Sequence, residues 1–176
     1  MSISSSLNAG VTGLASNASR LAAISDNIAN SGTYGYKRAA AEFESMVITG
    51  SAGGMGQASA VMFANEGARV ACIDLSEQNN AETMAQIGAI GGTAISIGAD
   101  VTRTADVERI VARTVTELGL PNILFNNAGA DTEDKQSILK IDEAAFDRVV
   151  EVNLKGPWLM IKHVAPKMIE ARSEEH

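Results

Sequence analysis

The sequence predicts an α/β fold in which a parallel sheet of about four strands is flanked by helices, with an amphipathic helix added at the N-terminus. Three observations support this prediction. A short β-branched run at 47–49 leads through a glycine-rich turn into a segment with helical periodicity. Strand-like and helix-like segments then alternate with short turns to about residue 171, which is typical of a right-handedly wound parallel sheet. Before residue 46, apolar residues repeat every seven positions.

The composition suits one globular domain of modest size with an appendage. The 176 residues are 45% hydrophobic and carry a formal net charge of −7, which argues against nucleic acid as the main partner because phosphate binding needs clustered Lys and Arg. Cys72 is the only cysteine, so no internal disulfide forms and a reducing, cytoplasmic location is expected. No apolar run reaches the length of a membrane span, the N-terminus lacks a secretory pattern, and no metal site is predicted.

The first segment, 1–45, differs from the rest of the chain. Basic and acidic residues balance over the first 46 positions, so the remainder carries the whole net negative charge. The leading apolar residues recur every seven positions, at Leu7, Leu14, Leu21 and Ile28. This spacing predicts a helix over 3–28 with a narrow apolar seam, which is marginal alone and needs a partner. From periodicity alone, a surface helix that caps the globular domain is the alternative.

The stretch Ser25–Arg38, which reads SDNIANSGTYGYKR, resembles the N-terminal signature of bacterial flagellar hook and rod proteins. The resemblance covers about 1–47 and implies a helix that packs against a C-terminal helix of the same chain, in subunits that stack into a tube. It implies flagellar subunits as partners through the 3–28 helix, the hook or basal body as an alternative location, and a possible export signal. No matching C-terminal helix follows in this sequence.

The turn after the first predicted strand carries Gly50, Gly54 and Gly56. Such a turn lets the backbone approach a pyrophosphate, and the next helix aims its free N–H groups at the anion. The following strand, 68–74, ends in Asp74, 24 residues after Gly50, where a carboxylate can accept hydrogen bonds from the adenosine ribose. The carboxylate would also repel a 2′-phosphate, so NAD is expected over NADP. An ordinary glycine-rich turn and a solvated Asp are the alternatives.

The later segments complete the predicted sheet and its helices. The expected elements are a helix to 67 with an inner face of Ala58, Val61, Met62, Ala64 and Ala68, a helix over 77–88, a strand over 94–97, a helix over 102–118, a strand with its turn over 123–130, and a long helix from 142 to about 170. The inner stripe of the 102–118 helix is Val107, Ile110, Val111, Thr114, Val115 and Leu118. The apolar stripe of the last helix is Phe146, Val149, Val150, Val152, Leu154, Leu159, Met160 and Val164. Pro157 is expected to kink that helix or begin a new turn, and His163 to be a surface or half-buried residue.

Five motifs occur in order: Thr49-Gly50-x-x-x-Gly54-x-Gly56, Asp74, Asp100-Val101, Asn126-Asn127-Ala128-Gly129 and Val152-Asn153-Leu154-Lys155-Gly156. Together they resemble the cofactor-binding half of the short-chain dehydrogenase/reductase family over about 46–171, which implies a Rossmann-like NAD-binding domain over 46–176. The resemblance assigns Gly50, Ser51, Gly54, Met55 and Gly56 to the pyrophosphate, Asp74 to the adenosine ribose, Asp100 and Val101 to adenine, and Asn126, Ala128 and Gly129 to the nicotinamide-side ribose. Asn153 matches the asparagine that supports a proton relay. A structural role, tying strand ends together, is also open for Asn126 and Asn127.

In this family a serine, together with a tyrosine and a lysine four residues apart, carries out the proton transfer. The resemblance ends before these three residues. The sequence holds only Tyr34 and Tyr36, and no Tyr-x-x-x-Lys. Losing a positioned acid–base group costs on the order of 10²–10⁴ in rate, so a truncated, catalytically incomplete oxidoreductase domain with no specified substrate is expected. In the family the 142–170 helix contributes to a dimer contact, which implies a homo-oligomer. A flagellar hook or rod subunit, and a fusion product without selected function, are the alternatives.

Overall fold

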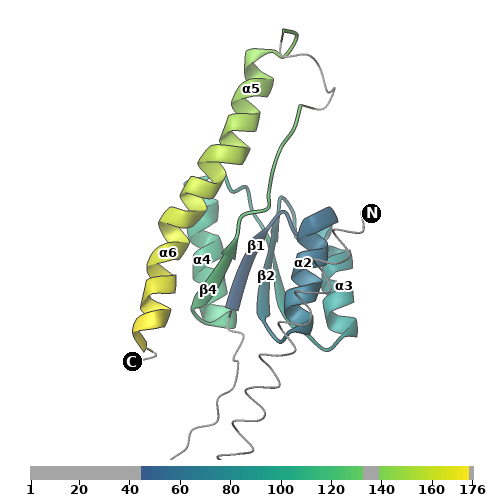
Figure 1. Ribbon diagram of the computed structural model, residues 1–176, viewed down its shortest axis with the longest axis vertical. Helices are drawn as coiled ribbons and strands as arrows, with labels where there is room; N and C mark the ends of the chain where they lie inside the picture. Colours follow the sequence, from purple (N-terminus) through teal and green to yellow (C-terminus); the bar gives the residue numbers. More distant parts are fainter. Residues whose placement is uncertain (1–44, 133–138, 175–176) are drawn as a thin grey trace, which may run out of the picture. The chain divides into compact units, whose positions relative to one another are not determined.

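Four parallel strands form one sheet in the order β3-β2-β1-β4 in the computed structural model (Figure 1). The structure describes residues 45–132 and 139–174. The elements in chain order are β1 (Ser45–Thr49), α2 (Gly54–Asn65), β2 (Arg69–Asp74), the 3-10 turn η1 (Gln78–Asn80), α3 (Ala81–Ala89), β3 (Thr93–Gly98), α4 (Thr104–Leu118), β4 (Pro121–Phe125), α5 (Glu143–Val150), the π-helical segment η2 (Glu151–Lys155) and α6 (Gly156–Glu174). The predicted fold class is confirmed. By its contacts the chain divides into Met1–Glu42 and Phe43–His176, and the predicted 3–28 helix lies outside the described residues.

β1 is the central strand because it pairs in parallel with both β2 and β4. Thr49 lies opposite Ile73 of β2, and Ile48 lies opposite Phe125 of β4. The chain leaves β1 toward β2 and β3 and later returns to place β4 on the other side. The loops after β1 and β4 therefore separate at the carboxyl ends of the strands, which is where open α/β sheets bind ligands.

Helices cover both faces of the sheet, with α2 and α3 on one face and α4 and α6 on the other (Figure 1). Successive residues of β1 alternate between these layers: Val47 packs in the cluster with α4 and α6, and Met46 and Ile48 pack in the cluster with α2 and α3. All five residues of β1 are buried. A strand that is covered on both faces explains why this run is almost continuously apolar.

The inner faces of the helices agree with the sequence in one case and differ in another. In α4 the predicted stripe is confirmed: Val107, Ile110, Thr114 and Leu118 are buried, and the other two members, Val111 and Val115, are half-buried. In α2 the prediction was correct in part. The predicted Ala64 is buried and Val61 packs half-buried against the same cluster, whereas the predicted Ala58 and Met62 are exposed. Gly56 and Ala60 are also buried, so small residues bring this helix close to the sheet.

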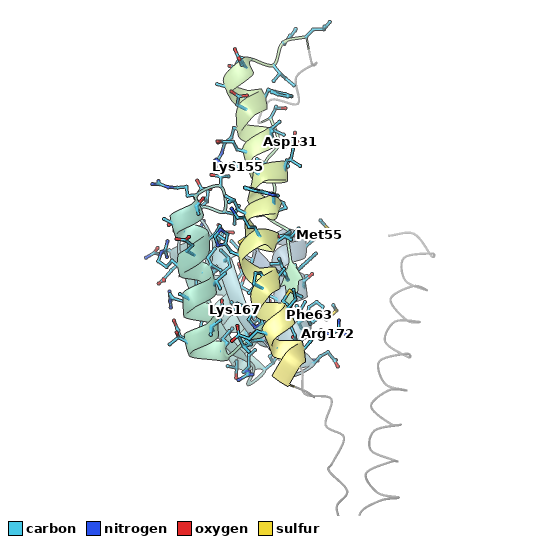
Figure 2. All side chains as sticks on the ribbon, turned by 90° about the vertical axis from the view of Figure 1, so that its left-hand side faces the viewer. Met55, Phe63, Asp131, Lys155, Lys167 and Arg172 are labelled. Atoms are coloured by element: carbon cyan, nitrogen blue, oxygen red, sulfur yellow. The ribbon has the colours of Figure 1, made fainter. Side chains whose placement is uncertain are left out.

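The predicted long helix from 142 is three consecutive helical segments, α5, η2 and α6, shown with their side chains in Figure 2. Asp142 caps the start of α5, because its carboxylate accepts a hydrogen bond from the Ala145 N–H at 2.8 Å. Pro157 is the second residue of α6, so it begins a new turn after the π-helical segment, as expected. The predicted apolar stripe divides: its buried members are Val152, Leu159, Met160 and Val164, whereas Phe146, Val150 and Leu154 are exposed.

None of the helices within 45–132 and 139–174 combines the length and the hydrophobicity that crossing a bilayer requires.

Candidate functional site

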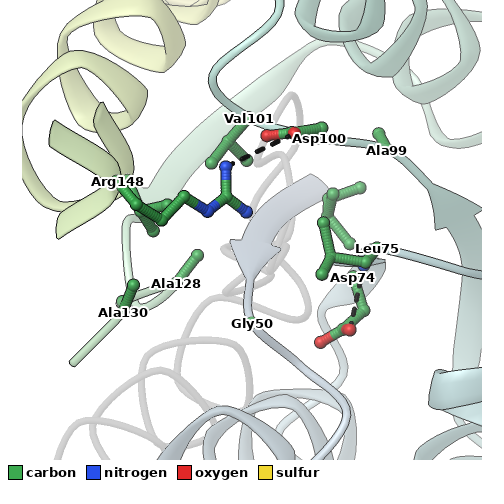
Figure 3. A pocket seen from close by; sticks show the side chains of 12 residues that line it. Gly50, Asp74, Leu75, Ala99, Asp100, Val101, Ala128, Ala130 and Arg148 are labelled. Atoms are coloured by element: carbon green, nitrogen blue, oxygen red, sulfur yellow. Dashed lines mark hydrogen bonds and ion pairs between the residues drawn. The ribbon is translucent and has the colours of Figure 1, made fainter. Parts of the chain in front are cut away.

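A cavity of about 230 Å³ opens at the carboxyl ends of the strands (Figure 3). Its walls come from the loops after all four strands and from the start of the α5–α6 helical run. The lining residues are Gly50, Ile73, Asp74, Leu75, Ala99, Asp100, Val101, Ala128, Gly129, Ala130, Arg148 and Val152. Residues up to 102 positions apart in the sequence therefore face one space, as expected for a binding site at the switch point of such a sheet.

The turn after β1 is held tightly between α2 and the loop after β4. Gly50 has φ of +67°, and a Cβ there would lie 2.8 Å from the Cα of Ala128. A Cβ on Gly56 would overlap the carbonyl oxygen of Gly50. Glycine is therefore required at both positions, for the left-handed backbone at one and for close packing at the other. A Cβ on Gly54 would meet nothing within 4 Å, so the start of α2 is open on that side.

The N-terminus of α2 is available to a ligand. Its N-cap residue, Gly53, makes no side-chain hydrogen bond to the helix. The backbone N–H groups of the first turn therefore have no side-chain cap. Uncapped N–H groups, together with the positive end of the helix dipole, favour an anion such as a phosphate.

Asp74 lies beside this turn. Its Oδ2 accepts a hydrogen bond from the Ala52 N–H at 3.3 Å. Its Oδ1 accepts bonds from the Leu75 N–H at 2.9 Å and from Nδ2 of Asn79 at 2.7 Å. The glycine turn and the acid at the end of β2, which were predicted from the sequence to contact the same nucleotide, are thus direct neighbours.

Ser51 is placed differently from the other turn residues. It is fully buried, and its hydroxyl donates to the Ile73 carbonyl at 3.1 Å and lies 2.9 Å from Oδ1 of Asn80. Thr83 donates its hydroxyl to the Ser51 carbonyl at 2.7 Å. The side chain of Ser51 therefore joins the turn to β2 and α3. Ser51, Gly54, Met55, Gly56 and Asn126 do not line the cavity, and contact between them and a cofactor stays a prediction.

Asp100 forms the wall after β3 together with Val101. Its Oδ1 accepts hydrogen bonds from the Thr102 N–H at 2.9 Å and from the Thr102 hydroxyl at 2.7 Å, and its Oδ2 lies 3.7 Å from Nη1 of Arg148. Partial burial raises the pKa of Asp100, but the two bonds from Thr102 and the charge of Arg148 outweigh it. The pKa therefore lies below its ordinary value, and the group is an anion at neutral pH.

The loop after β4 is tied to the end of β1. The Asn127 side chain donates to the carbonyls of Thr49 and Gly50 at 3.1 and 2.9 Å. In return, the Thr49 hydroxyl accepts bonds from the N–H groups of Asn127 and Ala128. Asn127 thus has the strand-tying role considered from the sequence. Asn126 differs, because its buried Oδ1 has no hydrogen-bond partner within the described residues.

Asn153 holds the next part of this loop. The residue lies in the π-helical segment η2, and its amide forms a reciprocal pair with Ala130: Oδ1 accepts from the Ala130 N–H at 2.8 Å, and Nδ2 donates to the Ala130 carbonyl at 2.9 Å. This pair joins the loop after β4 to the helix that follows it. It fixes the wall formed by Ala128, Gly129 and Ala130.

Six predicted cofactor residues line the cavity together: Gly50, Asp74, Asp100, Val101, Ala128 and Gly129. Six lining residues were not predicted as cofactor contacts: Ile73, Leu75, Ala99, Ala130, Arg148 and Val152. For Arg148 the signal was present, because it lies one helical turn before Val152 of the last motif, on the same side of a helix. Ile73, Leu75, Ala99 and Ala130 are immediate neighbours of predicted residues.

A family model described as "short chain dehydrogenase" matches residues 44–174. The chain belongs to the short-chain dehydrogenase family. A second model, "Flagella basal body rod protein", matches residues 7–37, which lie outside the described part of the chain.

Relatives and solved structures agree with this assignment. An "uncharacterized oxidoreductase" of Thermotoga maritima is 42% identical over 123 residues, which are 70% of this chain and 47% of the relative. The 3-ketoacyl-(acyl-carrier-protein) reductase of Brucella melitensis complexed with NADH is 30% identical, with a TM-score of 0.70 over 76% of this chain and 54% of that one. A metagenomic short-chain oxidoreductase in complex with NADP is 28% identical, with a TM-score of 0.69 over 74% and 58%. The chain thus spans about half the length of the curated relatives it matches.

Proposed function

We propose that this chain binds NAD through its domain over 46–176, as the cofactor-binding half of a short-chain dehydrogenase. The single observation that carries the proposal is the cavity, in which Asp74, Asp100 and the glycine turn face one space beside the open start of α2. Oxidoreductase chemistry of this family uses a nicotinamide dinucleotide, and solved neighbours are complexed with NADH and with NADP.

The residues present fit the adenosine end of such a dinucleotide. The cavity of about 230 Å³ is smaller than the roughly 300–1,000 Å³ of typical small-molecule sites, so it suits part of the cofactor. Leu75, Val101 and Val152 offer apolar walls to a flat base. In this proposal the Asp74 carboxylate, which lines the cavity, accepts hydrogen bonds from ribose hydroxyls, and the uncapped first turn of α2 binds the pyrophosphate.

NAD is preferred over NADP in this proposal because of the Asp74 carboxylate. A 2′-phosphate on the adenosine ribose would bring two or nearly two negative charges next to that anion. The remaining predicted roles, those of Asn126, Ala128 and Gly129 at the nicotinamide-side ribose and of Asn153 in supporting a proton relay, belong to the same proposal.

Residues 1–176 are proposed to bind the cofactor without ordinary turnover, since the sequence contains no Tyr-x-x-x-Lys. A hydride-transfer assay with NAD and a panel of simple alcohols tests this part. Robust turnover by the purified chain would refute it.

Titrating NAD into the purified chain while following thermal unfolding and heat of binding tests cofactor binding. At about 100 times the dissociation constant, a ligand that binds only the native state adds about 2.7 kcal/mol to the free energy of unfolding. For a domain of this size that is a rise of about 10 °C in melting temperature. An unchanged melting temperature and no heat of binding at millimolar NAD would refute the proposal.

A second candidate function rests on the flagellar match at 7–37. In this alternative, a separate segment over 1–45 directs the protein to the flagellum and contacts flagellar subunits. Co-fractionation of the tagged chain with hook–basal bodies, lost on deletion of residues 1–45, would support it. Recovery of the tagged chain only in the cytoplasm would contradict it.

A further inference from the structure

Arg148 is the only positively charged residue among the described residues that line the cavity. It lies on α5, outside every motif that the sequence analysis linked to the cofactor. Figure 3 shows its guanidinium group extending from the helix into the cavity, with Asp100 and Val101 on one side and Asp74 and Leu75 on the other.

The helix fixes the direction of this side chain. Arg148 and Val152 are four residues apart across the junction of α5 and η2, so they share one face of the helical run. Val152 is only 7% exposed and lines the same cavity. The face that carries Arg148 is therefore the face that closes the cavity.

Asp100 restrains the guanidinium at its far end. The two bonds from Thr102 hold one oxygen of Asp100, and the other oxygen lies 3.7 Å from Nη1 of Arg148. The side chains of Arg148 and Asp100 are 45% and 26% exposed. Both side chains of the ion pair are therefore partly exposed, so the guanidinium remains accessible to a ligand in the cavity.

The residues that line the cavity beside Arg148 indicate which kind of ligand group it can bind. Leu75, Val101 and Val152 present apolar surface without hydrogen-bonding side chains, which suits a planar ring. A guanidinium group is planar and weakly hydrated, and it stacks on aromatic rings with an added cation–π attraction. A lysine ammonium group offers the charge without the plane.

We propose that Arg148 is an adenine-binding residue whose guanidinium stacks on the purine ring and is held in position by Asp100. This inference rests on the proposed function, because it takes the cavity as the site of the adenosine half of NAD. It adds a residue from the helical run to a site otherwise built from the loops after the strands.

Two mononucleotides that each carry one phosphate separate stacking from simple charge attraction. AMP contains the adenine ring, whereas reduced nicotinamide mononucleotide does not. Dissociation constants of NADH, AMP and reduced nicotinamide mononucleotide are measured by calorimetry for the full chain and for Arg148→Ala, Arg148→Lys and Arg172→Ala. Arg172 is exposed and lies toward the C-terminal end of α6, so its replacement removes the same charge away from the cavity (Figure 2).

Arg148→Ala is expected to weaken NADH and AMP by about 3- to 10-fold and to leave the adenine-free nucleotide unchanged. Arg148→Lys should recover only part of the loss, and Arg172→Ala should match the original chain. Unchanged AMP binding in a folded Arg148→Ala chain, equal weakening of both mononucleotides, or full recovery with Lys would overturn the inference alone. If the original chain binds neither NADH nor AMP, the proposed function fails and the inference fails with it.

Discussion

Replacing Asp74 by Asn should reverse the preference between NAD and NADP. The structure sets the size of the effect. Three donors, from Ala52, Leu75 and Asn79, already occupy the carboxylate, and a carboxylate has about four acceptor sites. At least one site therefore remains for a ribose hydroxyl. Losing one hydrogen bond to a charged group costs about 1.5–3 kcal/mol, so NAD should bind roughly 10- to 150-fold more weakly.

NADP should gain from the same change. A 2′-phosphate about 5 Å from the carboxylate is repelled by about 1–3 kcal/mol per unit charge, taking an effective dielectric constant of about 20–80 for a half-buried group. Asp74→Asn removes this repulsion, so the ratio of the two dissociation constants should change by at least about 50-fold.

Calorimetric titration of both cofactors into the original chain, Asp74→Asn and Glu82→Gln measures this ratio. Glu82 is an exposed residue of α3 that does not line the cavity, so its replacement controls for the change in net charge. A melting curve for each variant shows that it is folded. A ratio for Asp74→Asn within twofold of the original would refute the role given to this carboxylate.

Three further predictions concern stability and reactivity. Gly56→Ala should destabilise the fold by about 1–3 kcal/mol, because the new Cβ meets the Gly50 carbonyl. The control is Gly88→Ala in α3, where a Cβ meets nothing within 4 Å, and this change should be neutral or stabilising. Equal urea midpoints for the two variants would contradict the packing argument. The native pKa of Asp100 is depressed, so its contribution to stability should be present above the unfolded value of about 3.9 and be lost as pH falls through the lower native value. Urea unfolding at pH 7 and below 4 should show this loss, and Asp100→Asn should reduce it; the same pH dependence in both chains would contradict it. Burial raises the pKa of Cys72 to about 12, so the thiol should not react with Ellman's reagent at pH 8 until the chain is unfolded in denaturant, and rapid reaction of the native protein would count against this burial.

Much of the fold could be read from the order and periodicity of the sequence. The apolar run of β1 and the acid-terminated run of β2 indicated buried parallel strands, because only strands covered on both faces have such continuous hydrophobicity. The stripe of α4 is equally direct, since its buried residues recur at helical spacing. The inner face of α2 was found only in part, because Gly56 and Ala60 are small residues that carry little hydrophobic signal, whereas Ala64 was predicted correctly.

The candidate site, like the fold, could be predicted from the sequence only in part. Gly50 and Asp74 are close along the chain and belong to one β-α-β unit, so their spacing alone predicted that they would be neighbours. The hydrogen bonds from Asn127 to the carbonyls of Thr49 and Gly50 span 78 and 77 positions, and no local pattern indicates which backbone groups they reach.

The sequence by itself therefore determined the strands, their parallel direction, the glycine turn and the acid that ends β2, because these depend on local spacing and on hydrophobic periodicity. Only the tertiary structure decided that Arg148 faces Asp100 across the cavity and that Asn153 pairs with Ala130. The physical reason is that both contacts depend on the position of the α5–α6 helical run against the sheet. Leu159, Met160 and Val164 fix that position by packing against core residues that are distant in the sequence, and hydrophobic periodicity does not indicate such contacts.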